Sequence, residues 1–437
     1  MEVYKQDNKG VIMKNTADII VVGTGVAGLF AALHLPHDKD ILLITKSDID
    51  KSDSFLAQGG ICVMYDESDY DAYFEDTMRA GHYENRKESV DIMLRSSRAI
   101  IDELLGLGVD FAKTPDGTLK FTREGAHSKP RICFHEDITG QEITEKLIAE
   151  VKRRNNIRII ENLEMIDITV SDNRCTGVVA RYPDRNMIQL KAMFTILATG
   201  GIGGLFNNST NFPHLTADAI AIAIKHGIEL ENPDYVQIHP TTLFTMTKGR
   251  KFLISESVRG EGAVLLDKNM QRFTDELQPR DVVSMAIWEQ MKKDNTHHVW
   301  LSMAPIPKAD ILSHFPNIYE HCLKEGYDVT KEPIPVVPAQ HYFMGGIKVD
   351  KHSKTTMDNL YAVGETSCNG VHGKNRLASN SLLEALVFSE RAAKHITDNF
   401  DNYKFIDQAV NLDDYTDCDK DYAKIARQKI ERIDTNE

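Results

Sequence analysis

Three glycines near the start of the chain have the spacing of a nucleotide-binding turn. Gly23, Gly25 and Gly28 follow an apolar run at residues 18–22. In this motif the first glycine permits a tight turn, the second lets the backbone approach a pyrophosphate, and the third allows close helix–strand packing. A structural turn, or a membrane span over residues 19–35, is the alternative, but the glycines and polar residues there disfavour a span. The expected ligand contacts are Gly23, Thr24, Gly25, Val26, Ala27 and Gly28.

A second segment with anion-binding chemistry lies near the other end of the chain. A buried strand is expected to end at Gly364, and Ser379 is expected to be the N-cap of an apolar helix. A helix start offers free backbone N–H groups and a positive dipole end, which suit a phosphate or a negatively charged ring. We therefore expect both ends of the chain to fold onto one cofactor. The residues expected to contact it here are Glu365, Asn380, Ser381 and Leu382.

The second strand, at residues 40–46, leaves the type of nucleotide open. An NAD site usually has Asp or Glu about 20 residues past the glycine turn, where the carboxylate holds the ribose hydroxyls. Lys46 stands there instead, which is compatible with NADP. The small, polar, glycine-rich loop at residues 54–61 favours FAD, because such a loop can lie along an isoalloxazine ring. Its expected contacts are Ser54, Ala57, Gln58, Gly59 and Gly60.

Two positions in the middle of the chain complete the expected cofactor site. An apolar strand ends on Gly200, where a ligand can again approach the backbone. Asp218 lies in the first turn of an expected helix at residues 216–224. Its carboxylate can bond a cofactor hydroxyl or simply favour the helix dipole.

Arg280 is unusual because of its position. It follows Pro279 at an expected helix start, where the helix dipole disfavours a cation. Its presence there indicates a function, since arginine binds a carboxylate through two parallel hydrogen bonds. Taken singly, however, an arginine at a helix start is more often a surface charge, and a histidine more often a core residue.

The composition is that of an ordinary globular protein. The chain has 437 residues with a formal net charge of −14, which disfavours nucleic acid or an anionic membrane surface as a partner. An anionic substrate must therefore be attracted by local positive charge. Residues 1–16 lack the apolar core of a signal peptide, and we predict a cytoplasmic protein. The six cysteines include no Cys-x-x-Cys pair, so neither a metal site nor a disulfide framework is predicted.

The order of expected elements predicts an α/β fold. Strands and helices alternate between about residues 18 and 227, as in a doubly wound parallel sheet with a β-meander. Prolines cluster between residues 305 and 338, which indicates an inserted domain. The predicted division is a cofactor-binding domain at residues 1–230 and 345–399, a capping domain at 231–344 and a short helical tail at 400–437.

Seven segments occur in an order that is typical of one family. They are the glycine turn and residues 57–61, 237–241, 259–262, 279–281, 341–346 and 375–381. Together they resemble the succinate dehydrogenase and fumarate reductase flavoproteins over about residues 17–395. The resemblance implies a Rossmann-like FAD-binding domain, an inserted α+β capping domain and FAD as the cofactor.

Two departures from this family bear on the cofactor and the tail. Members of the membrane complexes usually carry a histidine four residues before Ala57 that is covalently linked to the flavin. Asp53 occupies that position here, so the resemblance implies non-covalent FAD. Longer relatives end in a helical bundle, most of which we expect this chain to lack.

The resemblance also assigns substrate-binding and catalytic residues. Those expected to bind the substrate are Glu124, His239, Ser255, His341 and Arg376, and those expected to be catalytic are Arg280, Glu256 and His239. In the family, Arg280 would be the proton donor in fumarate reduction, relayed with Glu256. Arginine stays protonated in proteins, so substrate orientation and charge stabilisation are the roles we expect for it in amine oxidation. The group that takes the amine proton is left open.

Glu124 separates two possible substrates. The succinate and fumarate members are expected to have a non-acidic residue at this position. Aspartate differs from succinate by an α-ammonium, and a buried ammonium needs a counter-charge. The alternative is a loop acid paired with Arg123 or Lys129. Residues 122–128 therefore resemble the branch of the family that oxidises L-aspartate.

The predicted function is FAD-dependent oxidation of L-aspartate to iminoaspartate, with O2 (giving H2O2) or fumarate as the electron acceptor. By resemblance, the product enters quinolinate synthesis for NAD, which implies a functional link to quinolinate synthase. The alternatives are a soluble fumarate reductase and a flavoprotein subunit that acts with an iron–sulfur partner. A flavin-binding protein without enzymatic activity would not need the arginines and histidines.

Overall fold

The computed structural model describes residues 5–6, 12–246 and 249–430. Parts of the N-terminal segment that lacks a signal core, and residues 431–437 of the predicted tail, lie outside this range. Within the described residues, no helix combines the length and the apolar character needed to cross a membrane.

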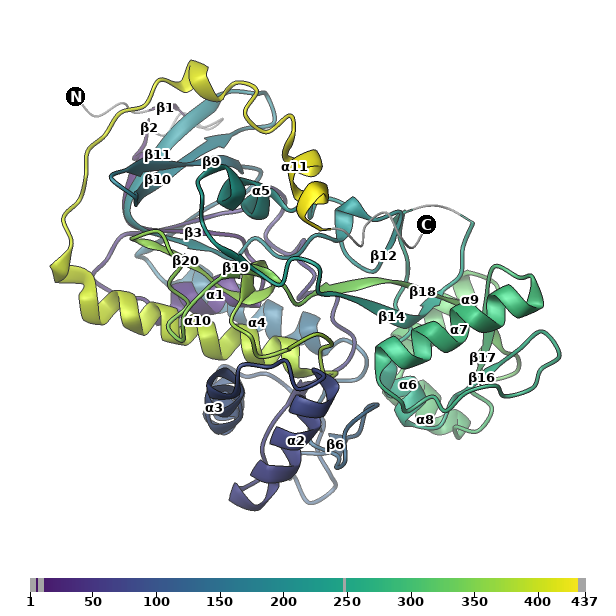
Figure 1. Ribbon diagram of the computed structural model, residues 1–437. Coiled ribbons are helices and arrows are strands. Elements are labelled where there is room, and N and C mark those ends of the chain that lie inside the picture. The colour runs from purple at the N-terminus through teal and green to yellow at the C-terminus, as the bar shows by residue number, and fades with distance from the viewer. Residues whose placement is uncertain (1–4, 7–11, 247–248, 431–437) are drawn as a thin grey trace.

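A seven-stranded sheet forms the centre of the cofactor-binding part of the molecule (Figure 1). Its order is β8–β4–β3–β11–β10–β9, and β20 also pairs with β11. The strands are β3 (Thr16–Val22), β4 (Ile41–Ile44), β8 (Ile157–Ile160), β9 (Glu164–Ser171), β10 (Arg174–Arg181), β11 (Met187–Leu197) and β20 (Leu360–Ala362). Strands β3 and β4 are parallel and buried almost throughout, as expected for apolar runs that are covered on both faces.

Strand β11 joins the two halves of this sheet. Its C-terminal part pairs in parallel with β3 and with β20, while its N-terminal part pairs antiparallel with β10. Strands β9, β10 and β11 form the predicted meander. The return of β20 to this sheet, far along the chain, brings the glycine turn after β3 close to the segment after β20.

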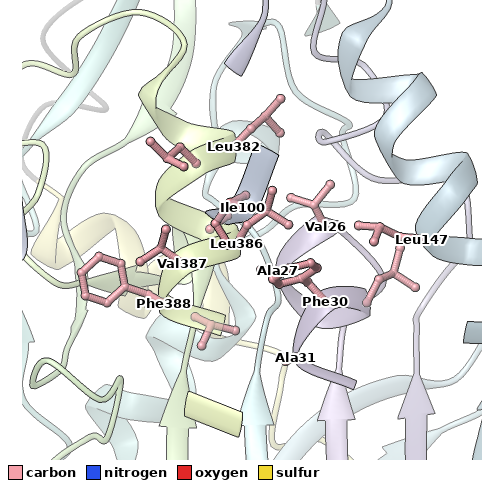
Figure 2. Packing of buried hydrophobic residues seen from close by; sticks show 14 of the residues in the cluster. Val26, Ala27, Phe30, Ala31, Ile100, Leu147, Leu382, Leu386, Val387 and Phe388 are labelled. Atoms are coloured by element: carbon pink, nitrogen blue, oxygen red, sulfur yellow. The ribbon is translucent and has the colours of Figure 1, made fainter. Parts of the chain in front are cut away.

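Helices from both ends of the chain lie on one side of the sheet (Figure 1). They are α1 (Val26–His34), α2 (Tyr70–Ala80), α3 (Lys87–Gly106), α4 (Thr139–Arg153) and α10 (Asn380–Asn399). Phe30 of α1 lies between Leu386 of α10 and Leu147 of α4 (Figure 2), and all three side chains are fully buried. Burying one such side chain contributes roughly 1.5–3 kcal/mol. This packing fixes the two helix starts relative to each other.

A second sheet with its own core lies to one side (Figure 1). Its order is β15–β12–β18–β17–β16, and β14 pairs antiparallel with β18. Its elements are β12 (Asn208–Ser209), β14 (Val236–Leu243), β15 (Gly249–Arg250), α6 (Glu256–Gly260), β16 (Val264–Leu266), α7 (Arg280–Asp294), β17 (Val299–Ser302), α8 (Lys308–His314), α9 (Pro316–Lys324) and β18 (Ile334–Phe343). The predicted fold class, a Rossmann-like part with an inserted α+β unit, is confirmed. The exact domain limits stay a prediction.

The remaining strands and helices of the described residues are short. They are β1 (Lys5–Gln6), β2 (Ile12–Met13), β5 (Ile61–Cys62), β6 (Phe121–Thr122), β7 (Ile132–Cys133), β13 (Leu230–Glu231), β19 (Gly346–Lys348), β21 (Ser367–Cys368), α5 (Asp218–Lys225) and α11 (Tyr422–Lys429). Five 3-10 turns lie at Glu67–Asp69, Gly203–Leu205, Gly364–Thr366, Phe400–Asn402 and Leu412–Tyr415. Helix α11 packs against α5, and Tyr422 and Ala426 are buried there in the hydrophobic core on the other face of the seven-stranded sheet.

The start of α10 differs from its prediction in one respect. Ser379 occupies the N-cap position, with a left-handed φ of 60°. Within the described part of the chain, however, its hydroxyl makes no capping hydrogen bond. The hydroxyl donates to Glu124 at 2.6 Å and accepts from the Gly60 N–H at 3.2 Å. Hydrogen bonds to residues distant in sequence therefore replace the expected local capping bond.

Candidate active site

One cavity collects nearly all the residues predicted to bind ligand. Its volume is about 1710 Å³, including the space at its mouth. Its lining runs from the glycine turn after β3 to the start of α7, which suits an elongated ligand. The predicted cofactor residues that line it are Gly23, Thr24, Gly25, Val26, Ala27, Lys46, Ser54, Ala57, Gln58, Gly59, Gly60, Gly200, Asp218, Glu365, Ser381 and Leu382. The predicted substrate and catalytic residues that line it are Glu124, His239, Ser255, Glu256, Arg280, His341 and Arg376.

Two predicted cofactor contacts, Gly28 and Asn380, lie behind this lining. A Cβ at Gly28 would stand 2.0 Å from the Gly23 carbonyl oxygen, so this glycine serves the close packing of α1 on its turn. The Asn380 side chain points to α2, where it accepts from the Tyr73 hydroxyl at 2.7 Å and donates to Thr77 at 3.3 Å. Both residues shape the site from outside the cavity.

The nucleotide end of the cavity is formed mostly by backbone. Gly23 has a φ of +112°, and a Cβ there would stand 2.1 Å from the Ala198 carbonyl oxygen. Only glycine fits this crossing of β3 and β11 without displacing the backbone. The first turn of α1 follows, and its Val26 N–H donates to Ser54 at 3.1 Å. Lys46 forms an ion pair with Asp218, so these two predicted contacts act as one unit.

Two buried carboxyl groups line the middle of the cavity. Asp53 accepts from the Phe212 N–H at 2.9 Å, and its Oδ2 has no hydrogen-bond partner among the described residues. Burial raises the pKa of Asp53 to about 7. Glu365 accepts from the Phe343 N–H at 2.9 Å, and burial raises its pKa to about 8. These carboxyls can pair with hydroxyl or N–H groups of a ligand.

Arg280 lies at the other end of the cavity, at the first residue of α7, and is 6% exposed. Its Nε donates to Glu256 at 2.5 Å and its Nη1 donates to Gln237 at 2.9 Å. Burial raises the pKa of Glu256, but the guanidinium groups of Arg280 and Arg259 outweigh it and hold this pKa below the ordinary value. Glu256 is therefore an anion beside Arg280, and the cation at the helix start is compensated.

Arg376 provides a second buried cation. Its Nη1 donates to Ser381 at 2.9 Å, and its guanidinium lies 4.5 Å from the centre of the Tyr342 ring. Its Nε has no hydrogen-bond partner among the residues described. Burial and the nearby Arg280 lower the pKa of Arg376 to about 10, so it remains a cation at neutral pH. A carboxylate ligand would relieve this desolvated charge.

His239 on β14 and His341 on β18 lie together in the second sheet. Their ring centres are 5.1 Å apart. The Nδ1 of His239 is within 3.2 Å of the Thr241 N–H, and that of His341 is 2.7 Å from the Thr210 hydroxyl. Burial, together with the Arg280 charge, lowers the pKa of both rings well below the ordinary value. Both are therefore neutral at pH 7 and can exchange hydrogen bonds with a carboxylate.

Glu124 is a buried acid and not a loop acid paired with a neighbouring cation. It is 2% exposed, and its two oxygens accept hydrogen bonds from Ser257 and Ser379, each at 2.6 Å. Lys129, one of the two alternative partners, lies 3.4 Å from Asp69 instead. Burial and the neighbouring Glu256 raise the pKa of Glu124. The cavity thus contains a carboxylate close to its two arginines.

Several residues of the site were not predicted. Gln237 donates to the backbone of Arg376 and to Asn375, both at 2.8 Å, and accepts from Arg280. It therefore joins the two arginine-bearing segments. Ser257 was also missed, because a serine in a short helix gives no signal of a distant partner. Gln237 lies within a predicted motif, and its polar type inside an apolar strand was the available signal.

Comparisons with known proteins agree with this arrangement. The family model described as "FAD binding domain" matches residues 18–382. An L-aspartate oxidase from Clostridium perfringens is 51% identical over 403 residues, which are 92% of this chain and 91% of that protein. One from Clostridium acetobutylicum is 51% identical over 385 residues, 88% of each chain. The chain belongs to the L-aspartate oxidase family.

The wider fold of this family is shared with a solved structure of E. coli quinol fumarate reductase. The TM-score is 0.83 at 30% identity, over 95% of this chain and 74% of that one. The family membership confirms the flavoprotein resemblance that the ordered motifs predicted.

The residues of the cavity fit FAD, the cofactor that the family implies. The glycine turn and the start of α1 can hold a pyrophosphate, since no side chain at Gly23 or Gly25 fills that space. The start of α10 lies on the cavity at Ser381. The buried Oδ2 of Asp53 and Oε1 of Gln58 lack partners among the described residues, as expected where a polar ligand completes the site.

Proposed function

We propose that the protein oxidises L-aspartate to iminoaspartate and returns the electrons to O2, giving H2O2, or to fumarate. The substrate ammonium first loses a proton. The Cα–H bond then breaks with both electrons leaving as hydride, and the nitrogen lone pair forms the C=N bond. FAD, when bound, supplies the hydride acceptor at its N5 atom.

The observation that carries this proposal is a buried carboxylate among buried cations. Glu124 lines the same cavity as Arg280 and Arg376, and all three are at most 6% exposed. A dicarboxylate without an amine has no group that pairs with Glu124. An α-ammonium provides the charge that Glu124 lacks.

The two carboxylates of aspartate have two sets of partners. We assign one to Arg376 with His341, and the other to Arg280 with His239. Both histidines are neutral, so each can donate from the ring nitrogen that is not engaged with the protein. Ser255, at the start of α6, borders the same space and completes the expected substrate contacts.

Arg280 and Glu256 orient the substrate and balance its charge. Their contact at 2.5 Å leaves the guanidinium fork held by Glu256 on one edge and Gln237 on another. A fixed cation can pair with a substrate carboxylate and hold the substrate in place without having to move during the reaction. In fumarate reduction, the same pair would deliver a proton to the alkene carbon that does not receive the hydride.

We further propose that FAD is held without a covalent bond. Asp53, the residue at the position of the linked histidine in the membrane complexes, has a carboxyl that already accepts from Phe212. Iminoaspartate would then pass to the next reaction of quinolinate and NAD synthesis, which supports a functional link to quinolinate synthase.

Anaerobic reduction of the FAD-loaded protein tests this function. L-aspartate is expected to bleach the flavin absorbance, succinate to leave it unchanged, and fumarate or air to restore it. Denaturation with acid should release all flavin into the supernatant if it is not covalently bound. A protein whose flavin is reduced by succinate and not by L-aspartate would contradict the proposal.

A further inference from the structure

The carboxylate of Glu124 is held from two sides by serine hydroxyls. Ser257, on α6, donates to Oε1 at 2.6 Å, and Ser379, before α10, donates to Oε2 at 2.6 Å. Ser257 belongs to the part of the chain that carries Arg280, and Ser379 to the part that carries Arg376. Glu124 itself lies on the loop after β6, so it joins three segments that are distant in sequence.

Each hydroxyl proton is directed to Glu124 by a donor that occupies the hydroxyl oxygen. The Gly60 N–H donates to Ser379 at 3.2 Å, and the Ser255 hydroxyl donates to Ser257 at 3.2 Å. Ser255 is oriented in turn, because it accepts from the Ser257 N–H as the N-cap of α6. A hydroxyl has one proton to donate, and both protons are used on Glu124. The two oxygens of Glu124 are therefore both acceptors, as in a carboxylate ion.

Opposing charges surround this carboxylate. Glu256 and the burial of the site favour its neutral form, while the two serines and Arg280 favour the ion. Arg259 and the Cys62 thiol also interact with it. With burial and Glu256 opposing ionisation, removal of one hydroxyl donor shifts the balance toward the protonated acid, which cannot pair with an ammonium.

We propose that Ser257, acting with Ser379, is a positioning residue that sets specificity for amino dicarboxylates by keeping Glu124 ionised and aimed at the substrate ammonium. This inference rests on the proposed function. The inference goes beyond the proposed function because it assigns selectivity to Ser257, which lies outside the cavity lining. Because Ser257 and Ser379 lie on different parts of the chain, the ammonium subsite is complete only when α6 and the start of α10 are both in place.

Ser257→Ala in the FAD-loaded protein tests the assignment. We expect kcat/KM for L-aspartate to fall about tenfold, mainly through KM, since a hydrogen bond to a charged group contributes on that scale. The acid limb of the pH profile of kcat/KM should move up by about one unit. Fumarate reduction with a chemical electron donor should stay within twofold, because fumarate has no ammonium.

Two further variants make the result specific. Ser284→Ala removes another buried hydroxyl from the same part of the chain, one that donates to the Ile238 carbonyl at 3.4 Å, and should change neither activity nor pH profile. Ser257→Thr keeps the donor and should stay close to the wild-type pH profile. The thermal midpoint of each variant, measured alongside, separates a loss of fold from a loss of selectivity.

The outcomes distinguish this inference from the proposed function. If L-aspartate does not reduce the flavin of the wild-type protein, both the proposed function and this inference are contradicted. If the wild type oxidises L-aspartate but Ser257→Ala matches Ser284→Ala in kcat/KM and in pH profile, only the inference is overturned. An equal loss of aspartate oxidation and fumarate reduction in Ser257→Ala would also overturn it.

Discussion

The two ends of the cavity offer different kinds of contact to a ligand. At the nucleotide end the contacts are mainly backbone, from the turn at Gly23 and Gly25 and from the first turn of α1. At the substrate end they are charged side chains, with Arg280, Arg376 and Glu124 brought together from separate segments. The first end is formed within one strand–turn–helix unit. The second exists only after both sheets have packed.

This difference predicts how each end responds to mutation. Backbone contacts tolerate most side-chain changes but fail where a Cβ has no room. The charged end tolerates changes of shape poorly, because each of its ions is buried and depends on one or two partners. The following substitutions separate the two ends.

The largest effect is expected for Arg280→Lys. Lysine keeps the charge but cannot bond Glu256 and Gln237 at the same time, as the guanidinium does. We expect kcat/KM for L-aspartate to fall about 10²–10³-fold, with FAD affinity unchanged in a fluorescence titration. Arg272→Lys, an exposed arginine of the same part of the chain, is the control. A loss of FAD in Arg280→Lys would show that the two ends are not independent.

The next effect is expected for Glu124→Gln. The amide keeps the size of the side chain but removes the negative charge that we assign to the substrate ammonium. Aspartate oxidation should fall about 10²-fold in kcat/KM while fumarate reduction is largely kept. Steady-state rates with both substrates measure the ratio, and Glu145→Gln, on the exposed face of α4, serves as the control. An equal loss of both activities would contradict the assignment.

A smaller effect, on the opposite end, is expected for Gly28→Ala. The added Cβ would stand 2.0 Å from the Gly23 carbonyl, so the turn must shift. We expect a loss of about 1–3 kcal/mol in the free energy of unfolding and weaker FAD binding. The ratio of aspartate oxidation to fumarate reduction should not change. Gly106→Ala, where nothing lies within 4 Å, should be neutral in a chemical denaturation experiment.

The smallest effect is a pH dependence of stability at Glu365. Burial raises its pKa from 4.5 to about 8 in the folded protein without ligand. Between these values the folded state binds more protons than the unfolded state, so this group contributes less stability as pH rises from about 4.5 to about 8. Glu365→Gln keeps the acceptor for the Phe343 N–H and removes the titration. The thermal midpoint of Glu365→Gln, relative to that of the wild type, should therefore rise as pH increases from about 4.5 to about 8. A difference between the two midpoints that does not change with pH would contradict the assignment.

Local patterns were enough to predict the fold and the nucleotide end. The strand before Gly23, the helix after it and the helix at α10 each follow from patterns within about twenty residues. The ordered motifs then placed the catalytic set by resemblance, and the structure brings every predicted substrate residue to one cavity.

The missed contacts are all tertiary. Ser379 was predicted to cap its own helix, since capping is a local role, but a carboxylate from a distant loop competes for its hydroxyl. Lys46 and Asp218 were treated as separate ligand contacts, and their ion pair depends on how α5 sits on the sheet. Gln237 and Ser257 depend on the register between β14, α6 and the α10 segment. Such pairings are absent from any single stretch of sequence.

The contact between α1 and α10 also orders events during synthesis. Residues 26–34 leave the ribosome long before residues 380–399, so α1 is made while the surface that covers Phe30 and its neighbours does not yet exist. A nascent chain that ends before Leu360 lacks β20, α10 and Arg376 together. The glycine turn is then complete, but its pocket is still open and the apolar side of α1 is still uncovered. Protection of that surface, by a chaperone or by slow release from the ribosome, has to last until α10 emerges.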